Sequence, residues 1–219
     1  ALFFCGVGQS VAELRQGHLS AHRYLEGVRL PVPPLSFDGR DALVRLAASV
    51  LDVTIDDDVV LRISRVSDGF PHYVHLLCQK LFWLAFRAEV DVDLIDVPMY
   101  RVAVAEAVNS AEAHLRLAYD RAVMKDRDEF REVLWAVADR HDGERNVRRV
   151  YEESYLRIML ACQRIPLELD EFIACVTKLR SPGYGAILVS RRRGWVAFRE
   201  AIMRGYVRLM AECAGVAIA

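Results

Sequence analysis

The chain has 219 residues, enough for one large domain or two small ones. Hydrophobic residues make up 53%, which excludes a mainly disordered chain, and 29 Lys and Arg against 30 Asp and Glu exclude a strongly basic, histone-like nucleic-acid-binding protein. No stretch approaches the roughly 18 uninterrupted apolar residues of a transmembrane helix. We therefore expect no membrane partner.

The cysteines indicate the cellular compartment of the protein, and the first residues indicate whether the chain is part of a longer one. Five cysteines are an odd number without the spacing of a disulfide framework, and we interpret them as buried free thiols of a cytoplasmic protein. The chain has no initiator Met and opens with the apolar run Ala1–Cys5, which is typical of a buried strand. We therefore expect it to be the C-terminal part of a longer protein.

Charge is divided unevenly along the chain. From Asp142 to the end there are 13 basic and 9 acidic residues, whereas the preceding part holds 16 basic and 21 acidic ones. Such a difference between the two parts predicts two modules with different partners.

The first 34 residues predict two short strands, over 1–6 and 28–31, with a short helix over about 10–16 between them. The segment Gly6-Val7-Gly8-Gln9-Ser10 partly resembles a dinucleotide-binding turn, but its third Gly is missing. No further alternation of strands and helices follows. The sequence therefore does not predict a Rossmann site.

Four helices that make one small bundle are expected next. Ser36 is a candidate N-cap for the first, Gly69 ends the second, and Pro71 suits the first turn of the third. An acidic connection without helical periodicity, residues 89–98, precedes the fourth. The expected helices cover residues 36–52, 56–69, 71–87 and 99–124.

The last part of the chain follows a different plan. Three helices are expected and then a hairpin, an order typical of a winged helix-turn-helix, with one more helix at the end. The helices cover about 127–140, 147–162, 168–180 and 199–213, and the hairpin covers 185–198.

Basic residues of this part are the candidate contacts to nucleic acid. Arg191, Arg192 and Arg193 form the hairpin turn, and Lys178 and Arg180 lie on the expected recognition helix. Acidic residues of the same helix disfavour a close approach to DNA; they are Glu168, Asp170 and Glu171. A solvated turn, or a wing that contacts protein, therefore remains the alternative.

Two groups of histidines have the spacing of one helical face. His18 and His22 are four residues apart, and His72, His75 and Cys78 follow the same period. Neither group contains the Glu of a hydrolytic His-Glu-x-x-His site, and no third ligand is evident. We therefore interpret them as polar histidines and expect no metal site.

Taken in order, these features resemble the second half of an AAA+ ATPase of the Orc1/Cdc6-like and STAND-like branch. Arg23 precedes a short strand that ends at Pro31, and the segment 67–77 contains Gly69-Phe70-Pro71, which is similar to the sensor-2 motif of the helical lid. The resemblance implies a mainly α fold with a remnant of the α/β P-loop ATPase core over 1–34, a four-helix lid bundle over 35–125 and a winged helix-turn-helix domain over 126–219.

The resemblance also assigns roles to single residues. Arg23 matches the arginine finger that stabilises charge on the γ-phosphate held by a neighbouring subunit, and Gln9 or Ser10 falls near the sensor-1 position. His72 stands where the family usually has a sensor-2 Arg, and because His is only partly charged at pH 7, its contact with phosphate would be weaker. A structural Arg23 and a helix-capping Ser10 are the alternatives.

The sequence contains no Gly-x-x-x-x-Gly-Lys-Ser/Thr loop and no apolar strand ending in paired acids. We therefore expect no ATP hydrolysis by this chain alone, and ATP and Mg²⁺ only together with an upstream core. The implied partners are that core, further copies of the chain, and DNA. The alternative is a stand-alone winged-helix module that binds DNA or protein and has no nucleotide role.

Overall fold

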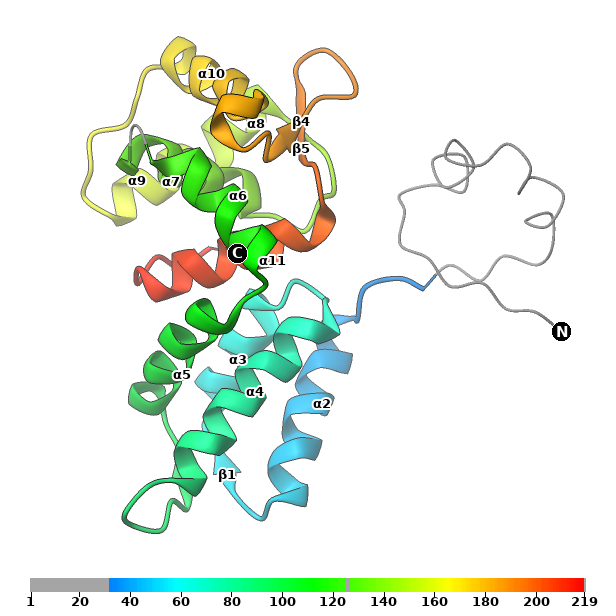
Figure 1. Ribbon diagram of the computed structural model, residues 1–219, viewed down its shortest axis with the longest axis vertical. Coiled ribbons are helices and arrows are strands. Elements are labelled where there is room, and N and C mark those ends of the chain that lie inside the picture. The colour runs from blue at the N-terminus through cyan, green and yellow to red at the C-terminus, as the bar shows by residue number, and fades with distance from the viewer. Residues whose placement is uncertain (1–31, 125–126, 219) are drawn as a thin grey trace, which may run out of the picture. The chain divides into compact units, whose positions relative to one another are not determined.

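The computed structural model describes residues 32–124 and 127–218, which are mainly helical (Figure 1). The expected strands and helix before Val32, together with Gln9, Ser10, Arg23, His18 and His22, lie outside the described residues. Residues 34–219 group as one compact unit. Within the described ranges, no helix has the length and apolar character needed to cross a membrane.

Four helices, here called the helical bundle, share the first hydrophobic core. They are α2 (Phe37–Val50), α3 (Asp57–Val66), α4 (Pro71–Phe86) and α5 (Val97–Ser110). The expected helices over 36–52, 56–69 and 71–87 are thereby confirmed. On α3, the residues Val59, Val60, Ile63 and Val66 are buried in this core at the spacing of one helical face.

Local polar groups define where these helices begin. The Ser36 hydroxyl accepts a hydrogen bond from the Gly39 N–H (3.1 Å), and Asp56 and Asp96 cap α3 and α5 in the same way. Pro71 occupies the first turn of α4, where its missing N–H costs nothing. The predicted N-cap Ser36 is therefore confirmed.

The acidic segment 89–98 is more than a connection. It contains β2 (Leu94–Ile95), which pairs in parallel with β1 (Thr54–Ile55). A strand of two residues is too short to show an alternating pattern in the sequence. Only the approach of the two segments in the fold creates this pairing.

The prediction of one long helix over 99–124 is wrong. The helix ends at Ser110, Ala111 is extended (φ −63°, ψ 155°), and α6 (Ala113–Val123) begins two residues later. Neither Gly nor Pro marks this break in the sequence. Ala111, Leu115 and Tyr119 belong to a second hydrophobic core, so packing decides the break between the two helices.

The second core belongs to the part of the chain from Ala111 onward, here called the C-terminal module. Its helices after α6 are α7 (Arg127–Ala138), α8 (Val147–Arg149), α9 (Leu156–Ala161), α10 (Leu169–Lys178) and α11 (Ala201–Cys213). A π-helical segment, η2 (Val150–Tyr155), joins α8 to α9 so that they read as one helix, and a short 3₁₀ turn, η3 (Pro182–Tyr184), follows α10.

A three-stranded antiparallel sheet completes the module. The expected hairpin is confirmed as β4 (Leu188–Val189) and β5 (Trp195–Phe198), with Leu188 opposite Phe198. A third strand, β3 (Arg145–Asn146), pairs with the other edge of β5, so that the strand order is β3-β5-β4. The sequence did not predict β3, which, like β1, has only two residues.

The turn between α3 and α4 requires glycine at position 69. Gly69 has φ +82°, and its carbonyl oxygen accepts a hydrogen bond from the Leu35 N–H at 2.8 Å. A Cβ atom on Gly69 would lie 2.6 Å from the Pro34 Cβ and 3.0 Å from the Leu35 carbonyl oxygen. Both the backbone angle and the space therefore exclude a side chain here.

We predict that Gly69→Ala lowers the free energy of unfolding by about 1–3 kcal/mol, because it combines backbone strain with a steric clash. The matched control is Gly143→Ala, since no atom lies within 4 Å of a Cβ at that position. Urea denaturation followed by circular dichroism measures both variants. Equal stability of the two would contradict the role assigned to Gly69.

Candidate functional site

The α3–α4 turn, which carries the resemblance to the sensor-2 motif, is held by the C-terminal module. Asp68 in this turn has a fully buried side chain and a left-handed backbone (φ +52°). Its Oδ1 lies 2.7 Å from Nδ1 of His141, in the loop between α7 and β3, and its Oδ2 accepts a hydrogen bond from Arg204 Nε on α11. One carboxylate thus joins three elements from both halves of the fold.

Further arginines of α11 extend this network. Arg204 also donates to the Asp142 carbonyl oxygen (2.7 Å), while Arg208 donates to the carbonyl oxygens of Arg65 (3.1 Å) and Ala138 (3.0 Å). Burial lowers the pKa of Arg208 to about 10, although the charge of Asp68 opposes this shift. Arg208 therefore stays protonated at neutral pH and ties one backbone carbonyl of each half to α11.

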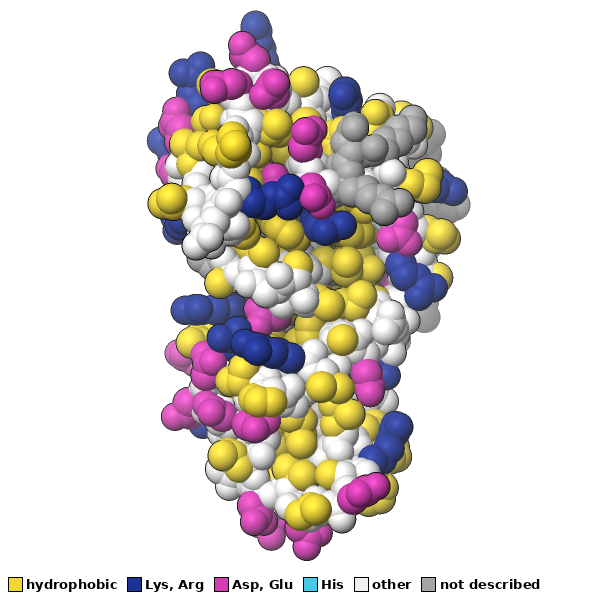
Figure 2. Space-filling view, turned by 90° about the vertical axis from the view of Figure 1, so that its left-hand side faces the viewer, with side chains coloured by type: hydrophobic (Ala, Val, Ile, Leu, Met, Phe, Trp, Pro, Cys, Tyr) yellow, Lys and Arg dark blue, Asp and Glu magenta, His cyan; other side chains and the backbone are white. Residues whose placement is uncertain are grey.

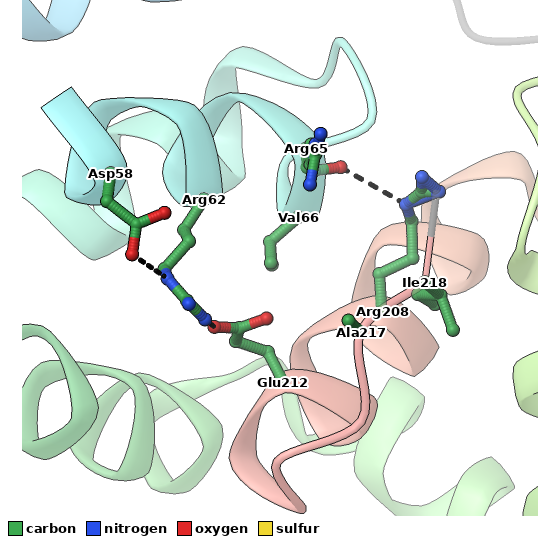
Figure 3. Close-up of a pocket in the computed structure, with 8 residues that line it drawn as sticks. All are labelled: Asp58, Arg62, Arg65, Val66, Arg208, Glu212, Ala217 and Ile218. Atoms are coloured by element: carbon green, nitrogen blue, oxygen red, sulfur yellow. Dashed lines mark hydrogen bonds and ion pairs between the residues drawn. The ribbon is translucent and has the colours of Figure 1, made fainter. Parts of the chain in front are cut away.

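A small cavity lies beside these contacts, between α3, α11 and the C-terminal residues (Figure 3). Arg62 spans one side of it, with 2.9 Å to Asp58 and 3.0 Å to Glu212. The cavity measures about 70 Å³. That volume suits water rather than a nucleotide, and Arg62 already pairs with the two carboxylates that line the cavity, so the cavity itself is not a cofactor site.

His72 is exposed in the first turn of α4, with its ring centroid 5.1 Å from that of Tyr73. The N-cap residue of this helix, Phe70, provides no side-chain hydrogen bond. His75 is exposed one turn further on, but Cys78 is buried, and burial raises the pKa of its thiol to about 12. The three residues thus do not share one environment, although they follow one helical period.

The wing, defined as Ser190–Gly194 between β4 and β5, exposes all three of its arginines. The Arg192 guanidinium stacks on the Trp195 ring, 3.3 Å from its centroid, and lies 3.4 Å from a Glu144 carboxylate oxygen. Within the described part of the chain, Arg191 and Arg193 have no carboxylate at ion-pair distance. The wing therefore offers two unpaired charges and one that is held in place.

The structure brings two further arginines to the wing. The Val147 N–H donates to the Gly194 carbonyl oxygen (2.9 Å), and Arg148 and Arg149 follow directly, exposed at the start of α8. Asn146 caps this helix start by accepting hydrogen bonds from both of their N–H groups. The sequence analysis missed Arg148 and Arg149, because only the pairing of β3 with β5 places them beside the wing.

Charge is divided along α10, the expected recognition helix. Lys178 is the last residue of α10, and Arg180, which the sequence placed on this helix, lies two residues beyond its end; both are exposed. The Lys178 ammonium lies 5.8 Å from the Phe130 ring centroid. The N-terminal end is acidic, and Glu168 and Glu171 close a capping box there. Figure 2 likewise shows basic and acidic side chains interspersed on the face it displays, with hydrophobic ones between them.

The chain matches no protein-family model, and a search of curated proteins finds no significant sequence similarity.

We predict that Asp68→Asn lowers the free energy of unfolding by about 2–4 kcal/mol, because it leaves the Arg204 guanidinium without its buried anionic partner. Asn adopts the left-handed conformation readily, so the loss reports on charge rather than on backbone strain. The matched control is Asp57→Asn, whose carboxylate pairs with Arg45 at 2.7 Å but is 85% exposed. We expect it to cost less than about 1 kcal/mol in the same urea titration. Similar losses for both variants would contradict a special role of Asp68.

Proposed function

We propose that the chain is the regulatory lid and winged-helix portion of an AAA+/STAND-type ATP-binding protein, in which it couples the nucleotide state to the binding of DNA or protein. The helical bundle together with α6 would correspond to the lid, and the part of the C-terminal module from α7 onward to the winged helix. ATP and Mg²⁺ would be held by an upstream core, and Arg23 would act on the nucleotide of a neighbouring copy.

One observation carries this proposal. The turn that resembles the sensor-2 motif, with Gly69 and Pro71, is the same turn whose Asp68 is bound by Arg204 and His141. In the proposed protein, nucleotide contacts at the start of α4 would displace this turn. Because the turn is fastened to α11 and to the α7–β3 loop, the displacement would reach the C-terminal module directly.

The topology of the C-terminal module supports the winged-helix part of the proposal. Its elements follow the order α7, β3, α8 to α9, α10, β4 and β5, with β5 in the middle of the sheet. In a winged helix-turn-helix, two helices pack as the turn motif and the last two strands form the wing. Arg148 and Arg149 follow directly after the Val147 N–H that donates to the Gly194 carbonyl oxygen of the wing.

A protein partner for the wing is the second candidate, and two observations favour it. The acidic N-terminal end of α10 would repel phosphates where a recognition helix enters the major groove. Arg192 is already paired with Glu144. In this alternative the module docks on a protein surface and has no contact with DNA.

The nucleotide role is tested first. We predict that the 219-residue chain alone shows no ATP turnover above background, whereas a protein that also contains the upstream core hydrolyses ATP. In that longer protein, Arg23→Ala should lower kcat by about 10-fold or more and leave ATP binding nearly unchanged, because an arginine finger stabilises the transition state. Turnover by the chain alone, or an unchanged kcat in the variant, would argue against this assignment.

The wing is tested by salt dependence. If Arg191, Arg193, Arg148 and Arg149 contact phosphates, replacing all four by Ala should make the slope of log K against log salt shallower by up to about 0.9 per lost contact on duplex DNA. The matched control is the double variant Arg101→Ala/Arg121→Ala, whose exposed arginines lie on α5 and α6. Equal slopes for the two variants, or no binding by the unmodified protein at low salt, would favour a protein partner.

A further inference from the structure

The two hydrophobic cores share one helix, α11, which lies between the helical bundle and the rest of the C-terminal module (Figure 1). Leu209 of α11 is buried in the core of the bundle, whereas Met203, Tyr206 and Val207 are buried in the core of the module. In return, Tyr73 of α4 is buried in the module core. Each half thus completes the core of the other.

The contact between α4 and α11 is especially close. A Cβ atom on Gly205 would lie 2.3 Å from Cε2 of the Tyr73 ring, so the ring packs directly on the helix backbone. The Tyr73 hydroxyl donates a hydrogen bond to the Ile202 carbonyl oxygen at 3.0 Å. Tyr73 is fully buried, and this contact cannot open without exposing its ring to water.

Polar contacts across the same interface fix its geometry. Asp68 binds Arg204, Arg62 binds Glu212, and Arg208 donates to carbonyl oxygens of both halves. Sliding the halves past one another would leave Asp68 and Arg208 buried without these partners, which is strongly unfavourable. Polar interfaces between separate domains usually permit relative motion, but here a shared helix and reciprocal burial oppose it.

We propose that α11 makes the helical bundle and the C-terminal module one rigid body with no hinge between them. Any movement of the α3–α4 turn then moves the wing by the same rigid-body rotation or translation. This inference does not depend on the nucleotide role, because it concerns only contacts within residues 34–218.

The test is hydrogen exchange by mass spectrometry on the whole chain across a urea titration, with amides of α4 and of α7 followed separately. A destabilising substitution is placed in one core at a time: Leu81→Ala in the bundle or Phe172→Ala in the module, both fully buried. A rigid body requires that each variant lowers the protection of both halves by the same factor. A loss confined to the half that carries the substitution would overturn the proposal.

A third variant tests the shared helix directly. Gly205→Ala drives a methyl group into the Tyr73 ring, and we expect it to lower protection at least 10-fold in α4 as well as in α7. Gly143→Ala, which meets no atom within 4 Å, is the matched control and should leave both unchanged. If Gly205→Ala reduces protection in α7 but not in α4, the two halves are independent and the proposal fails.

Discussion

The packing of the helical bundle against the C-terminal module depends on one buried carboxylate, that of Asp68. Asp68 is removed from water in a tight turn, where Arg204 compensates its charge and His141 Nδ1 lies 2.7 Å from its Oδ1; both partners come from the other half of the fold. A buried charge without such partners would be strongly destabilising, so the turn adopts its position only when the C-terminal module is in place. This constraint places the start of α4 against α11.

Arg208 and Tyr73, which lie near Asp68, extend this contact into an interface between the helical bundle and α11. Arg208 would be costly to bury alone, but it donates to the backbone carbonyl oxygens of Arg65 and Ala138 at the ends of α3 and α7. Tyr73 adds apolar area and packs against a helix position where only glycine fits. The polar contacts and the buried apolar contacts therefore involve the same elements, and α11 contributes side chains to both hydrophobic cores.

The candidate partner surface arises in a different way. The wing arginines are adjacent in the sequence, whereas Arg148 and Arg149 join them only because β3 pairs with β5. Neighbouring groups also determine how many charges are available, since Glu144 and Trp195 hold Arg192. A count of basic residues in the sequence includes all three wing arginines and does not distinguish the one that is already occupied.

Elements whose signals are local could be predicted from the sequence. Helical periodicity, the Ser36 cap, Pro71 and Gly69 specify α2 to α4, and the apolar runs around the basic turn specify the hairpin. The break at Ala111, the two-residue strands and the partners of Asp68 could not be predicted, because each depends on contacts between segments that are distant in the sequence. Local propensity reaches about one helical turn along the chain, whereas a buried charge and a shared core are satisfied only by residues far away in the sequence.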